Sequence, residues 1–213
     1  MAKMIPTELE DHIVNDVFRK AEITFYNECK SLPDNWYVLY GVIWVRNDDR
    51  RVSTEGEADF VIIGPEIGLV VIEVKGGGIS REGDYWYTTD RNNIKHPIKN
   101  PILQAITCKH NFVSYLKSNE FFSRRFFKAT HMVCYPNVSV NDITEYIDSP
   151  KELQIAYEDL NNLKQKIEIA VNYSNQKNIS ALTEEECYKM ANLLKPIQNM
   201  PGKWSIIAKM QTN

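Results

Sequence analysis

The hydrophobic pattern of the chain alternates between strand-like and helix-like stretches. Residues 36–45, WYVLYGVIWV, are aromatic and β-branched, a composition typical of a strand. Apolar runs at 60–63 and 69–75 flank the sequence Gly-Pro-Glu-Ile-Gly, which predicts a hairpin. Short strands are also predicted at 84–90, DYWYTTD, and at 130–136, THMVCYP.

Helical periodicity fills the intervals between these runs. Apolar side chains recur at helical spacing over 19–30 and 102–117, and further helices are expected near 158–172 and 183–195. The last of these opens with Thr183-Glu-Glu-Glu186, a capping box. This order of strands and helices predicts an α/β fold in which helices flank a mixed central sheet.

The same pattern suggests four parts of the chain. Residues 1–18 are expected to form an extended or weakly helical arm, 19–150 the core, 151–195 a C-terminal helical part, and 196–213 a tail or linker. The segment 91–101, RNNIKHPIKNP, is polar and is interpreted as a connection between strand and helix.

Composition and charge exclude several classes of protein. The 213 residues carry 25 Lys and Arg against 28 Asp and Glu, a net charge of −3, so any contact with nucleic acid depends on local basic patches. The four cysteines form no C-x-x-C pair, which favours reduced thiols. The N-terminus lacks a signal-peptide core, and no uncharged run is long enough to span a bilayer. We therefore expect a cytoplasmic protein with no membrane partner.

The most apolar segment of the chain contains charges that a core strand should not contain. If Ile63 pairs with Leu69 across the five-residue loop, Asp59 lies opposite Glu73, and opposed Cβ atoms are roughly 5 Å apart. Lys75 then shares the face of Glu73. A slip of one residue would move Asp59 to the other face, so the inference depends on the turn.

Two opposed carboxylates repel, and a divalent cation removes the conflict. Mg²⁺ is typically held by one or two carboxylates together with substrate phosphate and water. Asp59, Glu73 and Lys75 therefore suggest a metal-assisted phosphodiesterase that uses Mg²⁺ or Mn²⁺. The alternative is an ion pair between Glu73 and Lys75 at a solvated strand end, and the residues alone leave both interpretations open.

A longer stretch of the sequence resembles a known family and favours the metal-site interpretation over the structural ion pair. Asp59 followed by Glu73-Val-Lys75 resembles the D…(D/E)-x-K signature of the PD-(D/E)XK nucleases. The segments GEADFVIIGPEIGLVVIEVKGGG, WYTTD and NPILQA together resemble the NERD (nuclease-related domain) family over about residues 21–136. The N-terminal MAKMIP is similar to NERD proteins that continue into a helicase. The resemblance implies a restriction-endonuclease-like fold, a metal-dependent nuclease activity, and a helicase as a partner.

The resemblance also assigns roles to individual residues. It implies that Glu22 is the early acidic residue, that Asp59 and Glu73 bind metal, that Lys75 is the catalytic lysine, and that Gln104 completes the site. Ala58 stands where the simplest form of the signature has proline. The chain contains no G-x-x-x-x-G-K-[ST] motif, so a helicase portion is not expected within it. Taken alone, Glu22 and Gln104 are equally compatible with solvated helix positions.

Basic residues in two segments are candidates for contacts with nucleic acid. Lys99 and Lys109 belong to a patch near the proposed site. Arg124, Arg125 and Lys128 alternate with aromatic residues in FFSRRFFKATH, a composition suited to stacking on bases and binding phosphates. The alternative is that these aromatics pack inward and leave the arginines solvated.

The leading hypothesis is a nuclease that hydrolyses phosphodiester bonds in nucleic acid, with DNA as the first candidate substrate. A non-catalytic nucleic-acid-binding or partner-targeting module is the second, and a protein-interaction domain without activity is the third. The complete Asp–Glu–Lys set favours catalysis, whereas the acidic composition favours the other two.

Overall fold

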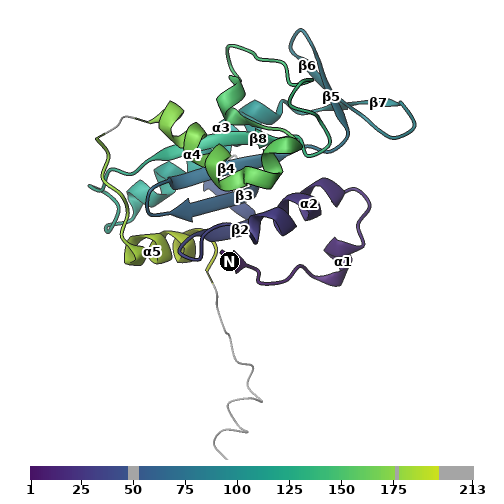
Figure 1. Cartoon of the computed structure of the whole chain (residues 1–213). Coiled ribbons are helices and arrows are strands. Elements are labelled where there is room, and N and C mark those ends of the chain that lie inside the picture. Colours follow the sequence, from purple (N-terminus) through teal and green to yellow (C-terminus); the bar gives the residue numbers. More distant parts are fainter. Residues whose placement is uncertain (48–52, 176–177, 197–213) are drawn as a thin grey trace, which may run out of the picture.

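The computed structural model describes residues 1–47, 53–175 and 178–196. Within them a six-stranded mixed sheet lies between helices on both faces, and a three-stranded antiparallel sheet lies to one side (Figure 1). The expectation of an α/β fold with a mixed central sheet flanked by helices is confirmed. None of the helices in these three ranges is long and apolar enough to cross a membrane.

The large sheet contains, in spatial order, β1 (Lys3–Ile5), β2 (Tyr37–Asn47), β3 (Ser53–Gly64), β4 (Gly68–Val74), β8 (Ala129–Cys134) and β9 (Gln154–Ile155). Strands β2, β3 and β4 are antiparallel neighbours. Strand β1 is parallel to β2, and β8 is parallel to both β4 and β9. The small sheet contains β5 (Gly78–Glu82), β6 (Tyr85–Thr89) and β7 (Lys95–Ile98).

Alternate side chains of β4 explain why both faces are covered. Val70 and Ile72 face α2 (Lys20–Cys29) and α4 (Leu163–Ser174), whereas Leu69 and Val71 face α3 (Pro101–Ser118) and α5 (Glu184–Leu194). Every residue of β4 is buried, as expected for a central strand with helices on both sides. The remaining helical segments are α1 (Asp11–Val14), η1 (Lys151–Leu153) and η2 (Glu158–Asn162).

Most predicted elements are present, and the capping box of Thr183 and Glu186 at α5 is confirmed. The interpretation of the segment 91–101 as a connection is wrong, because this segment contains β7. That strand is not predictable from its own residues, since it is largely exposed and pairs only with β6, so its side chains show no apolar alternation. Part of the predicted arm is also a strand, β1, in the large sheet. The tail from 197 onward lies outside the described residues, and the domain boundaries stay predictions.

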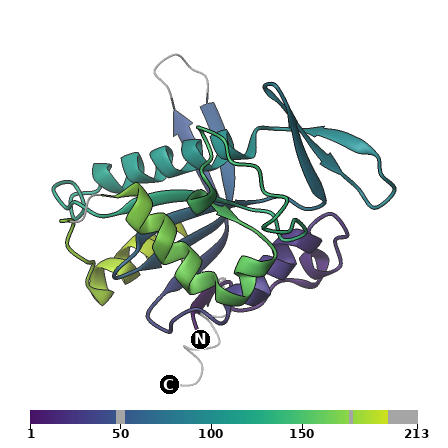
Figure 2. The same ribbon diagram turned by 45° about the horizontal axis from the view of Figure 1, so that its top comes forward.

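The small sheet lies between β4 and α3 in the sequence. The chain therefore leaves the large sheet at the C-terminal end of β4, forms the small sheet, and continues into the N-terminal end of α3. Figure 2 shows the small sheet to one side of the large sheet, while the far ends of β2 and β3 extend as a two-stranded ribbon. Trp86 of β6 anchors the small sheet by packing with Ile102 of α3 and Val133 of β8.

The hairpin register predicted from the sequence is confirmed, with Ile63 opposite Leu69. The turn that fixes it ends at Gly68, which has a φ of +67°. A Cβ atom at this position would lie 2.2 Å from the carbonyl oxygen of Lys128. Glycine at position 68 therefore permits the close approach of the hairpin to the start of β8.

Replacing Gly68 with alanine is expected to destabilise the protein by about 3 kcal/mol or more, because strain at positive φ is added to a clash with the backbone. Gly83 provides the matched control, since it has a φ of +62° and a Cβ atom added there would meet no other atom within 4 Å. Gly83→Ala should cost only about 1 kcal/mol. Equal losses for both variants in urea denaturation would refute the close-approach argument.

Candidate active site

The ordered pairing of β3 with β4 ends immediately before the predicted acidic pair. Its last partners are Phe60 and Ile72, so Asp59 and Glu73 are next in the same register. There the side chain of Asp59 takes the place of a backbone acceptor on β3, since its Oδ2 accepts a hydrogen bond of 2.7 Å from the backbone amide of Val74. Both carboxyl groups are thus at the C-terminal end of β4, where the small sheet diverges.

A change of face in the two neighbouring strands explains this position of Asp59. Phe60 packs on the α2 face and Ala58 on the α3 face, although alternate residues of a regular strand share one face. Opposite them Tyr40 and Val42 also differ, and the intervening Gly41 has a φ of +62°. The Asp59 side chain therefore lies at the point where both strands rotate.

Glu73 is almost completely buried, with 2% of its surface exposed. Its Oε1 lies 2.5 Å from Nζ of Lys75, so the predicted ion pair within the strand exists. It does not lie at a solvated strand end, however, because the carboxylate is inside the protein. The ion pair and the acidic pair of Asp59 and Glu73 are parts of a single arrangement.

The electrostatics of the three groups are strongly coupled. Burial raises the pKa of Asp59 to about 8, and the nearby Glu73 contributes to the increase. Burial also raises the pKa of Glu73, although Lys75 opposes that effect. For Lys75, burial lowers the pKa, but the two carboxylates outweigh it and the net shift is upward. The cation of Lys75 therefore compensates only part of the buried negative charge.

Asp59, Glu73 and Lys75 line a cavity of about 640 Å³. Two further predicted residues, Lys99 and Gln104, line the same cavity from the start of α3 and the residues before it. The Oε1 atom of Gln104 is buried and has no hydrogen-bond partner among the described residues. An unsatisfied acceptor of this kind is costly, so the cavity is suited to a ligand or water that donates a hydrogen bond.

Glu22 lies beside this cavity, on α2. Its Oε2 accepts hydrogen bonds from the Tyr40 hydroxyl at 2.6 Å and from Arg19 at 3.2 Å. Its charge contributes to the upward pKa shifts of Asp59 and Glu73, which places it within electrostatic reach of both. It is not among the residues that line the cavity.

The remaining basic candidates lie elsewhere. Lys128 donates a hydrogen bond to the carbonyl of Glu66 in the hairpin turn, at the start of β4 and roughly 17 Å along the strand from Glu73. Arg125 forms an ion pair of 2.6 Å with Glu186 of α5, and Arg124 is exposed nearby in sequence. Lys109 is partly buried, with Nζ 3.4 Å from Nδ1 of His131. Among the candidate cations, the structure brings Lys75 and Lys99 to the cavity.

Among the lining residues of this cavity that sequence reasoning missed, Glu57 and Trp44 matter most for its chemistry. Glu57 lies two positions before Asp59, and its charge helps to raise the pKa of Glu73. The alternation Glu55, Glu57, Asp59 is a usable signal for an acidic strand. Trp44 has no such signal, because a tryptophan in a hydrophobic strand predicts burial.

The carboxyl groups fit a hard divalent cation as donors. Each uses one oxygen in an internal hydrogen bond, Asp59 with Val74 and Glu73 with Lys75, and no described residue bonds to the other oxygen. The described ranges contain no cluster of three or more His, Cys, Asp or Glu side chains arranged to hold a metal. A cation here would therefore complete its coordination with water or phosphate, as Mg²⁺ commonly does.

Comparison with protein families finds a match to a nuclease-related domain. The family model named NERD, nuclease-related domain, matches residues 19–136, which is 118 of the 213 residues. No curated protein and no solved structure matches the chain. The matched range begins immediately before α2 and ends just after β8, so it contains Glu22, the hairpin and Gln104.

The pKa of Asp59 predicts an unusual dependence of stability on pH in metal-free protein. A carboxyl group with a pKa of about 8 in the folded state and 3.8 in the unfolded state holds its proton preferentially when folded. The free energy of unfolding should therefore fall as pH rises from 5 to 8. Asp59→Asn should remove about 1 to 3 kcal/mol of that fall, since each pKa unit corresponds to about 1.4 kcal/mol and water relieves part of it.

Urea denaturation in EDTA at several pH values measures this effect, with the exposed Asp34→Asn as control. If the free energy of unfolding depended on pH in the same way for wild type and Asp59→Asn, the pKa of Asp59 would not be raised in the folded protein.

Proposed function

Because this chain belongs to the NERD, nuclease-related domain, family, we propose that it is a metal-dependent nuclease that hydrolyses phosphodiester bonds. The observation that carries the proposal is that the buried carboxyl group of Glu73, the partly buried one of Asp59 and the ammonium group of Lys75 line one cavity of about 640 Å³. Such a group of acids is costly for folding and is explained by a ligand of opposite charge.

Asp59 and Glu73 would hold Mg²⁺ or Mn²⁺, and the bound ion would polarise the phosphodiester and lower the pKa of an attacking water. The protein's own groups then have distinct tasks. Lys75, which lines the cavity and is held by Glu73, stabilises negative charge that develops on the phosphate. Gln104 offers its unsatisfied Oε1 as an acceptor that orients a water molecule. Glu22 supports the site through its negative charge.

Lys99 lies at the same cavity and is proposed to contact substrate phosphate. Lys109, Arg124, Arg125 and Lys128 would contribute only to a longer nucleic acid that extends beyond the cavity. DNA is the proposed substrate, the cytoplasm the proposed location, and a helicase the proposed functional partner, in keeping with the resemblance of the N-terminal residues to helicase-linked proteins.

A non-catalytic nucleic-acid-binding or partner-targeting module is the second candidate. The positions of Lys109, Arg125 and Lys128 away from the cavity favour it. The two candidates differ in whether the chain cleaves nucleic acid in the presence of Mg²⁺ or Mn²⁺.

Lys75→Met should lower the rate of cleavage at least about 100-fold with little change in substrate binding, because the lost charge acts on the transition state. The matched control is Lys95→Met, which removes the lysine of an exposed Lys–Glu pair, Lys95 and Glu82, at a similar distance of 2.6 Å. Cleavage of labelled single- and double-stranded DNA with Mn²⁺, Mg²⁺ or EDTA provides the measurement. Wild-type protein that cleaves neither substrate with either metal would support the binding module instead.

A further inference from the structure

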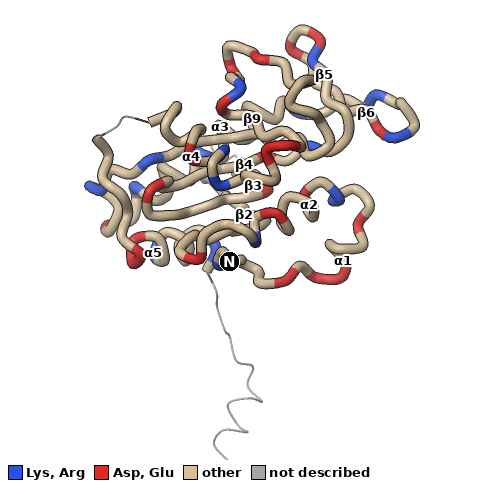
Figure 3. The backbone as a smooth tube through the Cα atoms, in the orientation of Figure 1, with Lys and Arg blue, Asp and Glu red and all other residues tan. Residues whose placement is uncertain are grey.

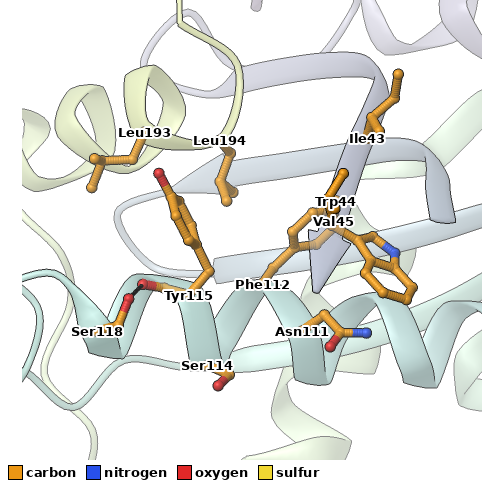
Figure 4. A pocket seen from close by; sticks show the side chains of 10 residues that line it. All are labelled: Ile43, Trp44, Val45, Asn111, Phe112, Ser114, Tyr115, Ser118, Leu193 and Leu194. Atoms are coloured by element: carbon orange, nitrogen blue, oxygen red, sulfur yellow. Dashed lines mark hydrogen bonds between the residues drawn. The ribbon is translucent and has the colours of Figure 1, made fainter. Parts of the chain in front are cut away.

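Trp44 forms part of the wall between the catalytic cavity and a second hollow. It lines the cavity of Asp59 and Glu73, and it also lines a groove of about 400 Å³ between β2, α3 and α5. Figure 4 shows the indole between β2 and α3, with the groove continuing past Phe112 towards Tyr115. A ligand that lies against the indole of Trp44 therefore borders both hollows.

The indole is held in one orientation before any ligand binds. Its Nε1 donates a hydrogen bond of 3.3 Å to Sγ of Cys108 on α3. Directly opposite on β3 is Gly56, where a Cβ atom would come within 2.6 to 2.9 Å of three atoms of the ring. The absence of a side chain at Gly56 thus lets the ring pack closely against the strand. A fixed aromatic plane loses little entropy when a flat ligand stacks on it.

The charges of the residues around Trp44 do not favour phosphate as the main group bound there. Among the residues that line the catalytic cavity are four acids, Glu55, Glu57, Asp59 and Glu73, against two lysines. The groove beyond Trp44 is lined by uncharged residues: Ile43, Trp44, Val45, Asn111, Phe112, Ser114, Tyr115, Ser118, Leu193 and Leu194. Binding of nucleic acid in the groove therefore requires an attraction that does not depend on phosphate charge.

Nucleobases have the chemistry that such a surface accepts. Their faces are apolar and stack on aromatic rings, and their edges form hydrogen bonds with neutral polar groups. Trp44 and the half-exposed Tyr115 provide rings along the groove, and the amide of Asn111 lines the same groove. Leu103, 57% exposed, provides an apolar surface in the catalytic cavity itself. In a duplex the base faces are already covered by stacking, so only unpaired bases can use these surfaces.

We propose that Trp44 is a stacking platform for an unpaired nucleobase beside the cleaved phosphate, and that the groove towards Tyr115 receives the next bases, so that the substrate is single-stranded nucleic acid. This rests on the proposed function for the position of the cleaved bond. The binding surface itself does not depend on catalysis.

The test compares a (dT)12 strand with an all-abasic strand of the same length and with a 12-base-pair duplex. Binding is measured by fluorescence anisotropy in Mn²⁺, in a Lys75→Met background that limits cleavage. We expect at least tenfold tighter binding of (dT)12 than of the duplex, and a weak dependence on salt. Trp44→Leu should weaken binding of (dT)12 about tenfold and leave the abasic strand unchanged, whereas Trp44→Phe should stay within about threefold of the parent.

Tyr115→Leu should weaken binding of (dT)12 less than Trp44→Leu does. Tyr173→Leu, which removes an exposed helical tyrosine of α4 that lines neither hollow, should have no effect. A general loss of folding in Trp44→Leu would be recognised because binding of the abasic strand would fall equally, and Trp44→Phe would then decide the question. The proposal would be overturned if Trp44→Phe weakened binding of both (dT)12 and the abasic strand, or if Trp44→Leu bound (dT)12 normally. It would also be overturned if the duplex bound as tightly as (dT)12, or if no strand bound.

The proposed function can fail separately. Selective loss of (dT)12 binding in Trp44→Leu, combined with a wild type that cleaves nothing, would retain the stacking site and reject the nuclease. Cleavage of duplex DNA that is indifferent to Trp44 would retain the nuclease and reject the stacking site.

Discussion

The juxtaposition of a buried carboxyl group, Glu73, and a partly buried one, Asp59, at the end of one hairpin is the constraint on which the rest of this structure depends. Glu73 of β4 is inside the protein, Asp59 of β3 accepts a hydrogen bond from the backbone of β4, and Lys75 supplies one nearby positive charge. Separating such charges from water costs several kcal/mol for each ion. The raised pKa of about 8 for Asp59 expresses that cost as a retained proton.

The backbone around Asp59 and Glu73 is arranged so that the two carboxyl groups are held next to each other. Gly68 brings the hairpin against the start of β8 and fixes the register that places Asp59 next to Glu73. Gly41 allows β2 to rotate opposite Asp59, so that the carboxyl group reaches the amide of Val74. Beyond this rotation β2 and β3 carry Trp44 and Glu57 to the cavity. In Figure 3 acidic and basic positions are interspersed over the described chain, so the charge at this site is a local feature.

Much of this arrangement could be predicted from the sequence, because it rests on short-range rules. The hairpin loop and its register follow from Gly-Pro-Glu-Ile-Gly between two apolar runs, and α3 follows from its apolar periodicity. Strand β7 could not be predicted, since it is exposed and is defined only by its partner β6. The role of Trp44 and the pairing of Arg125 with Glu186 depend on elements distant in sequence, and residue types alone do not reveal such contacts.

If Asp59 and Glu73 bind a divalent cation, the melting temperature of the protein must depend on the concentration of Mn²⁺. A ligand that binds only the folded state stabilises it by an amount that grows with its concentration. We expect Mn²⁺ to raise the melting temperature of the wild type in a saturable manner. Asp59→Asn should abolish the increase, and Glu82→Gln in the exposed Lys95 pair should preserve it. A wild type whose melting temperature does not respond to Mn²⁺ or Mg²⁺ would contradict the binding of a divalent cation by Asp59 and Glu73.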